Sequence, residues 1–216
     1  IDDALIKVIA PCVLPVHPTI SLRTGIPHVP DEFGRRPMIK TAIDIVATST
    51  RRSISQDSAL GTPVISGVIV DLVQNVLAQY PENHRPRVKV IPEFSGTAYN
   101  GPRRSATVQR GLSTLLRRSP EDVLDKEEFV IGANTLRGVP DTLDPALSGL
   151  IGEHPERWLK DYSFDLLGTV LPMMWLYGVA VEAHLQNTLV RAKTSNIGVE
   201  YMGIALRDFS GIRILR

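Results

Sequence analysis

The apolar residues of the chain recur with the period of a helix in three stretches. Pro63 opens the first helix and Tyr80-Pro81 stops it; the apolar positions between them are Ile65, Val68, Ile69, Leu72 and Val76. A longer apolar helix is predicted to start near Tyr162. A basic amphipathic helix is predicted over residues 105–118.

Alternating apolar and polar positions predict strands elsewhere in the chain. Residues 38–46 alternate, so Lys40 is expected to project from one face of a strand. Residues 88–94 predict another strand, with Glu93 near its end. Thr48, Ser49 and Thr50 are suitable caps for a short helix that carries Arg51 and Arg52.

The end of the chain has the pattern of an antiparallel hairpin. Residues 201–206 and 211–215 are predicted to pair, with Asp208 in the turn between them. Together with the helices, these strands indicate an α+β fold.

The amino-acid composition is typical of a globular protein. With 24 basic and 23 acidic residues and a net charge of +1, the chain has no general signature of nucleic-acid or membrane binding. A single cysteine, Cys12, excludes an internal disulfide framework and favours a reducing cytoplasm. The uncharged run 166–181 is shorter than the ~20 residues of a membrane span and contains Gly168 and Pro172, so a buried helix is expected. The chain does not start with Met, and we expect it to be a portion of a longer protein.

A polar cluster follows the long apolar helix. Glu182, His184, Gln186 and Asn187 stand within six positions, and Asp208 follows on the predicted hairpin. Carboxylate and amide oxygens suit Mg²⁺, which also binds the phosphates of nucleotides, so the pattern indicates an ATP site. On an ideal helix these side chains would face two ways, and the helix must therefore end or distort near residue 183.

The order of these residues is also that of a kinase-like metal site. An acidic residue stands five positions before Asn187, and Asp208-Phe209-Ser210-Gly211 takes the place of the kinase Asp-Phe-Gly. The kinase His-Arg-Asp is missing. The structural alternative is a buried polar cluster at a helix end, with Asp208 in an ordinary turn.

The motifs resemble, in order along the chain, those of the NRPS-independent siderophore synthetases of the aerobactin synthetase type. The matching pieces are Leu14-Pro15-Val16-His17-Pro18, Ser21-Leu22-Arg23-Thr24, Lys40-Thr41-Ala42, Thr48-Ser49-Thr50-Arg51-Arg52, Tyr177-Gly178, Glu182-Ala183-His184-Leu185-Gln186-Asn187 and Arg207-Asp208-Phe209. Only Thr19 and Ile20 separate Pro18 from Ser21, where the family has a longer connection, and the family's N- and C-terminal portions are absent. The chain is therefore expected to be an incomplete domain, or one from which stretches have been left out.

The resemblance implies an enzyme of siderophore biosynthesis that serves iron acquisition. Such a ligase uses ATP and Mg²⁺ to adenylate citrate or a related acid, transfers the acyl group to an amine or hydroxyl, and releases AMP and pyrophosphate. It also implies a palm-like nucleotide-binding domain over residues 1–216, with an antiparallel sheet, flanking helices and a kinase-like hairpin at the metal site. The expected partners are these small molecules in the cytoplasm, without nucleic acid or membrane, and assembly as a homodimer is compatible with the sequence.

The resemblance assigns roles to individual residues. The nucleotide contacts it implies are Ser21, Arg23, Thr24, Lys40, Arg52, His184 and Gln186, of which Lys40, Arg52 and His184 are the catalytic group. The metal ligands it implies are Glu182, Asn187 and Asp208. His17 and Arg117 are the candidates for the substrate acid.

Each of these residues also has an ordinary structural alternative. Lys40 on an exposed strand face, Arg52 as a surface charge and His184 as a core histidine are the alternatives for the catalytic group. Ser21 and Thr24 are compatible with turn chemistry alone, and Arg117 with a solvated helix face. Glu93 could orient a basic residue or the incoming amine. A kinase-like phosphotransferase and a non-catalytic nucleotide-binding module remain the alternative functions.

Overall fold

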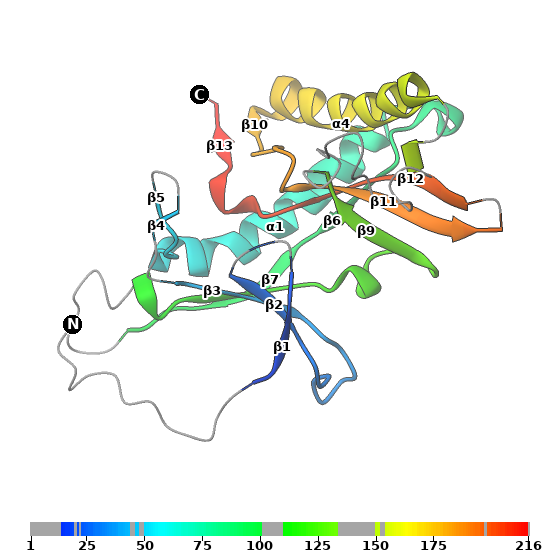
Figure 1. Cartoon of the computed structure of the whole chain (residues 1–216). Coiled ribbons are helices and arrows are strands. Elements are labelled where there is room, and N and C mark those ends of the chain that lie inside the picture. Colours follow the sequence, from blue (N-terminus) through cyan, green and yellow to red (C-terminus); the bar gives the residue numbers. More distant parts are fainter. Residues whose placement is uncertain are drawn as a thin grey trace. The chain divides into compact units, whose positions relative to one another are not determined.

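The computed structural model describes residues 14–19, 21, 23–43, 46–47, 50–100, 110–133, 150–151, 154–196 and 198–215. The chain divides into two compact units, one of residues 1–65 and 93–119 and the other of residues 66–92 and 120–216. Both are built from strands and helices, as the expected mixed fold requires (Figure 1). We describe each unit by itself.

The first unit contains a five-stranded antiparallel sheet. Its strands occur in the order β1 (Val16–Pro18), β2 (Thr24–Pro27), β3 (Met38–Thr41), β8 (Thr114–Arg117) and β7 (Glu93–Thr97). A small separate ladder joins β4 (Val46–Ala47) to β5 (Thr50–Arg51). The start of helix α1 (Gln56–Leu77) belongs to this unit, where Ile54 and Ala59 pack on Leu115 of β8.

Three predictions for the first unit are wrong. The strand expected over residues 38–46 is broken into β3 and β4. The short helix expected after residue 50 is replaced by β5, which pairs with β4. The basic helix is contradicted at its end, because β8 is a strand that pairs with both β3 and β7; residues 101–109 lie outside the described part. In β8 the hydrogen bonds and packing supplied by two neighbouring strands outweigh a helical spacing of apolar residues.

The second unit contains a four-stranded mixed sheet. Its order is β6 (Val88–Ile91), β12 (Gly198–Arg207), β11 (Thr188–Ser195) and β9 (Glu128–Gly132), with β6 parallel to β12 and the other pairs antiparallel. Helix α4 (Pro155–Tyr177) contacts β12 and β6 (Figure 1). Single 3₁₀ turns occur at η1 (Glu82–His84), η2 (Pro120–Asp122) and η5 (Phe209–Gly211).

The predicted terminal hairpin is wrong in its pairing. Residues 201–206 belong to β12, whose hairpin partner is the preceding strand β11. Beyond Asp208 the chain turns away and forms β13 (Arg213–Ile214), which pairs with β10 (Val179–Ala180). The first helix also differs from the prediction, because it starts at Gln56 and keeps Pro63 in its interior.

The inner face of α4 is anchored by a buried carboxylate. Asp165 is 1% exposed and accepts hydrogen bonds from the backbone N–H of Arg87 (2.8 Å) and the hydroxyl of Tyr201 (2.9 Å). Burial, reinforced by the nearby negative charge of Asp165, raises the pKa of Tyr201, so the phenol keeps the proton that it donates. These bonds tie α4 to β12 and to the chain before β6.

Among the described helices, α1 meets the length and composition of a membrane span, with 33% of its apolar window buried. Ile69, Val73 and Val76 on this helix are all 0% exposed. An apolar helix that packs into a core has the same composition, so this helix is weak grounds for a membrane span.

Candidate functional site

The residues Ser21 to Thr24 form a hydroxyl-rich turn in the first unit. The backbone N–H of Thr24 donates to the carbonyl of Ser21 (3.1 Å), and the Thr24 hydroxyl donates to the Ser21 hydroxyl (3.2 Å). Thr19 completes the turn, because its hydroxyl accepts from the Ser21 N–H (3.1 Å) and donates to the Thr24 carbonyl (3.0 Å). This role of Thr19 was not predicted from the sequence. These hydrogen bonds are those of an ordinary turn, which was the structural alternative for Ser21 and Thr24. They also hold the hydroxyls of Ser21 and Thr24 together.

Arg23 connects this turn to the segment that carries Arg52. Its Nη1 donates to the carbonyl oxygens of Arg52 (3.0 Å) and Ser53 (2.9 Å). The Thr41 N–H also donates to the Arg23 carbonyl (2.9 Å), which fixes the turn against β3. Arg23 therefore positions the backbone at Arg52, whose side chain is half-buried.

Lys40 lies directly across from Thr24 in the β2–β3 ladder. It is 2% exposed, so the alternative of an exposed strand face is wrong. A charged ammonium loses hydration when it is buried, and this cost is tolerated where the charge is used or compensated. Residues Ser21, Arg23, Thr24, Lys40 and Arg52 are thus joined by direct contacts or strand pairing within the first unit.

In the second unit, the loop that carries the polar cluster begins where α4 ends. Gly178 caps the helix in the left-handed conformation (φ 64°), and its carbonyl accepts from the Leu215 N–H (2.7 Å). The helix therefore ends before Glu182, as the conflict between helix geometry and a single site required. Asn187 stabilises the loop, because its side-chain amide donates to the Glu182 carbonyl (3.1 Å) and its N–H to the His184 carbonyl (2.8 Å).

Asn187 and Asp208 lie at the same end of the β11–β12 hairpin, so their predicted proximity is confirmed. The Arg207 N–H donates to the Asn187 carbonyl (3.1 Å), and Asp208 is the next residue. Asp208 has a left-handed backbone (φ 65°) and its carboxylate accepts from the Ser210 hydroxyl (2.8 Å). A non-glycine residue in this conformation is uncommon and is found at functional sites more often than elsewhere.

Arg207 has a structural role that sequence reasoning did not assign. It is 5% exposed, and its Nε and Nη2 both donate to the Gln186 carbonyl, at 3.2 and 2.9 Å. The motif Arg207-Asp208 was visible in the sequence, but the contact depends on the pairing of β12 with β11. This side chain holds the loop of the polar cluster against the hairpin end.

Gly211 allows the Glu182 carboxylate to pack beside the turn that follows Asp208. A Cβ atom on Gly211 would lie 2.5 and 2.6 Å from the two carboxylate oxygens of Glu182, so the flexible end of that side chain would have to move. The carboxylate of Glu182 therefore packs directly on the backbone of the turn that follows Asp208.

The donor set suits a cation that retains other ligands. Within the described residues no three His, Cys, Asp or Glu side chains form a metal group, whereas Glu182 and Asp208 with the Asn187 amide supply two carboxylates and one amide oxygen. Mg²⁺ is usually held by one or two carboxylates together with water and substrate phosphates, so the residues fit it.

His184 is exposed and carries a defined hydrogen bond. The Gln186 N–H lies 3.3 Å from His184 Nδ1, which accepts from it. With Nδ1 as the acceptor, the proton of the neutral ring is on Nε2, which is left to donate. The alternative of a core histidine is wrong, because the side chain faces solvent.

The two candidates for the acid differ in their surroundings. His17 on β1 is exposed and stacks on His28 with ring centroids 3.9 Å apart. Arg117 is 1% exposed on β8 and is held by Glu93, so the alternative of a solvated helix face is wrong. Within the described residues no hydrogen bond, ion pair or ring contact joins these two side chains.

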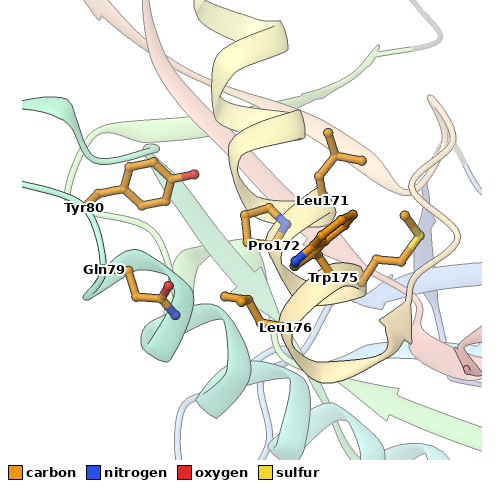
Figure 2. Close-up of a pocket in the computed structure, with 7 residues that line it drawn as sticks. Gln79, Tyr80, Leu171, Pro172, Trp175 and Leu176 are labelled. Atoms are coloured by element: carbon orange, nitrogen blue, oxygen red, sulfur yellow. The ribbon is translucent and has the colours of Figure 1, made fainter. Parts of the chain in front are cut away.

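A pocket of about 490 Å³ in the second unit is a poor acid site. It is lined by Gln79, Tyr80, Leu171, Pro172, Met174, Trp175 and Leu176 (Figure 2). None of these side chains is charged, and a polycarboxylate requires compensating cations when it leaves water. We therefore do not assign the acid to this pocket.

Residues 1–137 match the sequence model of the IucA/IucC family. The chain belongs to the IucA/IucC family. Residues 156–216, which hold the polar cluster, separately match the model described as ferric iron reductase FhuF-like transporter. The resemblance drawn from the motifs is confirmed.

Curated relatives of this IucA/IucC member include a citrate ligase and a staphyloferrin synthase. D-ornithine–citrate ligase of Staphylococcus aureus is 25% identical over 214 residues, which cover 90% of the chain and 31% of the relative. Staphyloferrin A synthase of the same organism is 28% identical over 185 residues, covering 82% and 28%. The chain spans less than a third of the length of these relatives.

Solved structures of the family share the fold. The petrobactin biosynthesis protein AsbB from Bacillus anthracis superposes with a TM-score of 0.68 at 25% identity over 89% of the chain and 31% of AsbB. ATP-bound aerobactin synthetase IucA from Klebsiella pneumoniae gives 0.63 at 18% identity, over 89% of the chain and 34% of IucA, and so supports the fold alone. The mixed α/β fold is that of the siderophore synthetases.

Proposed function

We propose that the chain is the nucleotide-binding portion of a cytoplasmic, ATP-dependent siderophore synthetase. The synthetase adenylates citrate or a related acid and condenses it with an amine or hydroxyl, releasing AMP and pyrophosphate. The observation that carries this proposal is the local assembly of the motif residues in a member of the IucA/IucC family, hydroxyls and cations in one unit and carboxylates with an amide in the other. The palm-like and kinase-like descriptions belong to this proposal.

Adenylation needs positive charge because a carboxylate and ATP repel each other. A carboxylate oxygen forms a bond to the α-phosphorus, and the bond to pyrophosphate breaks. Lys40 supplies a point charge and Arg52 a planar fork for the phosphate oxygens. Ser21 adds a hydroxyl donor that Thr24 orients through its own hydroxyl, and Arg23 adds guanidinium donors. The amine or hydroxyl then attacks the acyl carbon, loses its proton, and AMP leaves.

The polar cluster of the second unit would serve the metal and the α-phosphate. Glu182, Asn187 and Asp208 would hold Mg²⁺, which when bound neutralises phosphate charge. His184 donates from Nε2 to the α-phosphate, where negative charge develops, and Gln186 orients the ring through its backbone N–H.

The identity of the nucleotide product tests this function. With ATP, Mg²⁺ and citrate, the protein in its full length should form AMP and pyrophosphate, and hydroxylamine should trap the acyl adenylate as a hydroxamate. Formation of ADP without a hydroxamate, across a panel of citrate-like acids, would favour the phosphotransferase. Binding of ATP without turnover would favour the non-catalytic module. His17 and Arg117 remain candidates for the acid, and a homodimer remains the proposed assembly.

Lys40→Ala and Arg52→Ala should each weaken Mg²⁺-dependent ATP binding by roughly 1.5 to 3 kcal/mol, the value of a hydrogen bond to a charged group. Both cations neutralise phosphate in this proposal. Isothermal titration with Mg·ATP measures the loss, and circular dichroism checks that the variants are folded. Unchanged affinity in folded variants would remove both residues from the site.

Gly211→Ala should raise the Mg²⁺ concentration that ATP binding requires about tenfold, because the new methyl group displaces the Glu182 carboxylate. Gly67→Ala in α1 is the matched control, since a Cβ there has no neighbour within 4 Å. ATP affinity is titrated at several Mg²⁺ concentrations. If both glycine variants respond to Mg²⁺ like the wild type, Glu182 does not hold the metal.

A further inference from the structure

The first unit contains a buried ion pair on the same sheet face as Lys40. Met38 lies across from Arg117 in the β3–β8 ladder, and Glu93 lies across from Arg117 in the β7–β8 ladder. Lys40 lies across from Leu115. Residues directly opposite share a face, and positions two apart on one strand also share it, so all five side chains point to one side of the sheet.

The side chains on that side of the sheet are buried. Lys40 is 2% exposed and Leu115 0%, while Glu93 and Arg117 are each 1% exposed. Ile54 and, at the start of α1, Ala59 cover the face at Leu115. Three ionisable side chains are therefore held in one buried layer.

The pair is asymmetric. Arg117 Nε and Nη2 donate at 2.8 and 2.6 Å to the same oxygen, Oε1 of Glu93. In the fork arrangement that stabilises arginine–carboxylate pairs best, each carboxylate oxygen takes one bond. A buried pair without optimal geometry is often no more stable than an apolar replacement. Stability alone is thus a weak reason for this pair.

A bulge aims Glu93 at Arg117. The register of β7 against β8 shifts between Glu93 and Ser95, which leaves Phe94 as the extra residue. The shift puts both Glu93 and Gly96 on the same sheet face as Lys40, and Gly96 lies so close to the Ala59 carbonyl that a Cβ could not fit. Bulges commonly redirect a side chain beside a functional site.

We propose that Glu93 and Arg117 are positioning residues for Lys40. Arg117 is the diagonal neighbour of Lys40, about 7–8 Å away between backbones, and its positive charge repels the ammonium from its own end of the face. Glu93 fixes the Arg117 guanidinium against β7, so this repulsion acts from one fixed place and the ammonium of Lys40 keeps one position on the face. The inference rests on the proposed phosphate-binding role of Lys40.

A mutant cycle in two backgrounds tests it. The double change Glu93→Gln/Arg117→Met is made in the wild-type protein and in the Lys40→Ala protein, and the affinity for Mg·ATP is titrated in all four. Removing both partners leaves the net charge of the buried layer unchanged, so the double variant should fold and melt within a few degrees of the wild type. We expect it to bind Mg·ATP about tenfold more weakly in the wild-type background and less than about twofold more weakly in the Lys40→Ala background.

Other outcomes have distinct meanings. An equal loss in both backgrounds, or no loss, overturns the positioning role and leaves a structural pair. Unchanged ATP affinity with a raised KM for citrate overturns it in favour of a direct contact of Arg117 with the acid. A double variant that fails to fold also overturns it, because the pair is then required for stability. Wild-type protein that binds no Mg·ATP would instead refute the proposed function.

A surface ion pair provides the matched control. Arg35 and Asp31 form a 3.0 Å pair in the same unit, with side chains 39% and 29% exposed. Exposed pairs contribute little, so Asp31→Asn/Arg35→Met should leave both melting temperature and Mg·ATP affinity unchanged.

Discussion

Gly203→Ala should destabilise the second unit by roughly 3 to 5 kcal/mol, a large share of the ~5–15 kcal/mol of a typical domain. Gly203 lies in β12, which pairs with β11 on one side and β6 on the other. Its φ is 122°, a region that L side chains rarely adopt, and a Cβ would lie 2.7 Å from the Cβ of Arg87 and overlap the Arg87 carbonyl oxygen. That carbonyl already accepts from the Ile204 N–H at 2.9 Å, so it cannot move without breaking the ladder.

Gly198→Ala separates the cost of the positive φ from the cost of crowding against Arg87. Gly198 has a similar φ of 129°, but a Cβ there would have no neighbour within 4 Å. This variant should therefore show only the backbone strain, roughly 1 to 3 kcal/mol. Urea unfolding of the two variants and the wild type gives the comparison. Equal losses would show that crowding against Arg87 is unimportant.

His184→Ala should lower the rate of acyl-adenylate formation about 10²- to 10³-fold and change the affinity for Mg·ATP less than about threefold. The Gln186 N–H is bonded to Nδ1, which leaves Nε2–H as the donor. A donor aimed at charge that develops on the α-phosphate acts mainly in the transition state, so the loss should appear in the rate.

Hydroxylamine trapping measures the rate, and titration measures the affinity. His84→Ala is the control, because His84 is an exposed histidine of η1. A parallel loss of rate and affinity in His184→Ala would mean that the imidazole contacts the ground state of ATP instead.

Helices and chemistry were the parts of this protein most accessible from its sequence. The apolar run before residue 178 is a helix, because sustained spacing along one segment is a local property. The conflict between helix geometry and a single polar cluster correctly required the helix to end before the cluster. Asn187 and Asp208 were correctly expected together, although the strand pairing offered as the reason was wrong.

The strands were less accessible because their stability comes from neighbours far along the chain. β8 was expected as a helix, yet it pairs with β3 and β7 from two other parts of the sequence. The roles of Arg207 and Gly211 were missed for the same reason, since each depends on a segment about 20 to 30 residues away.

By itself the sequence determined the residue types, their order and the family, because a motif is a set of side chains with defined chemistry at defined spacing. Only the tertiary structure decided which of them meet. It buried Lys40 in the sheet of the first unit, paired Arg117 with Glu93, and packed the Glu182 carboxylate on the backbone of Gly211. These contacts follow from strand register and from the close approach of backbones, and both are set by the packing of the whole unit rather than by any one segment.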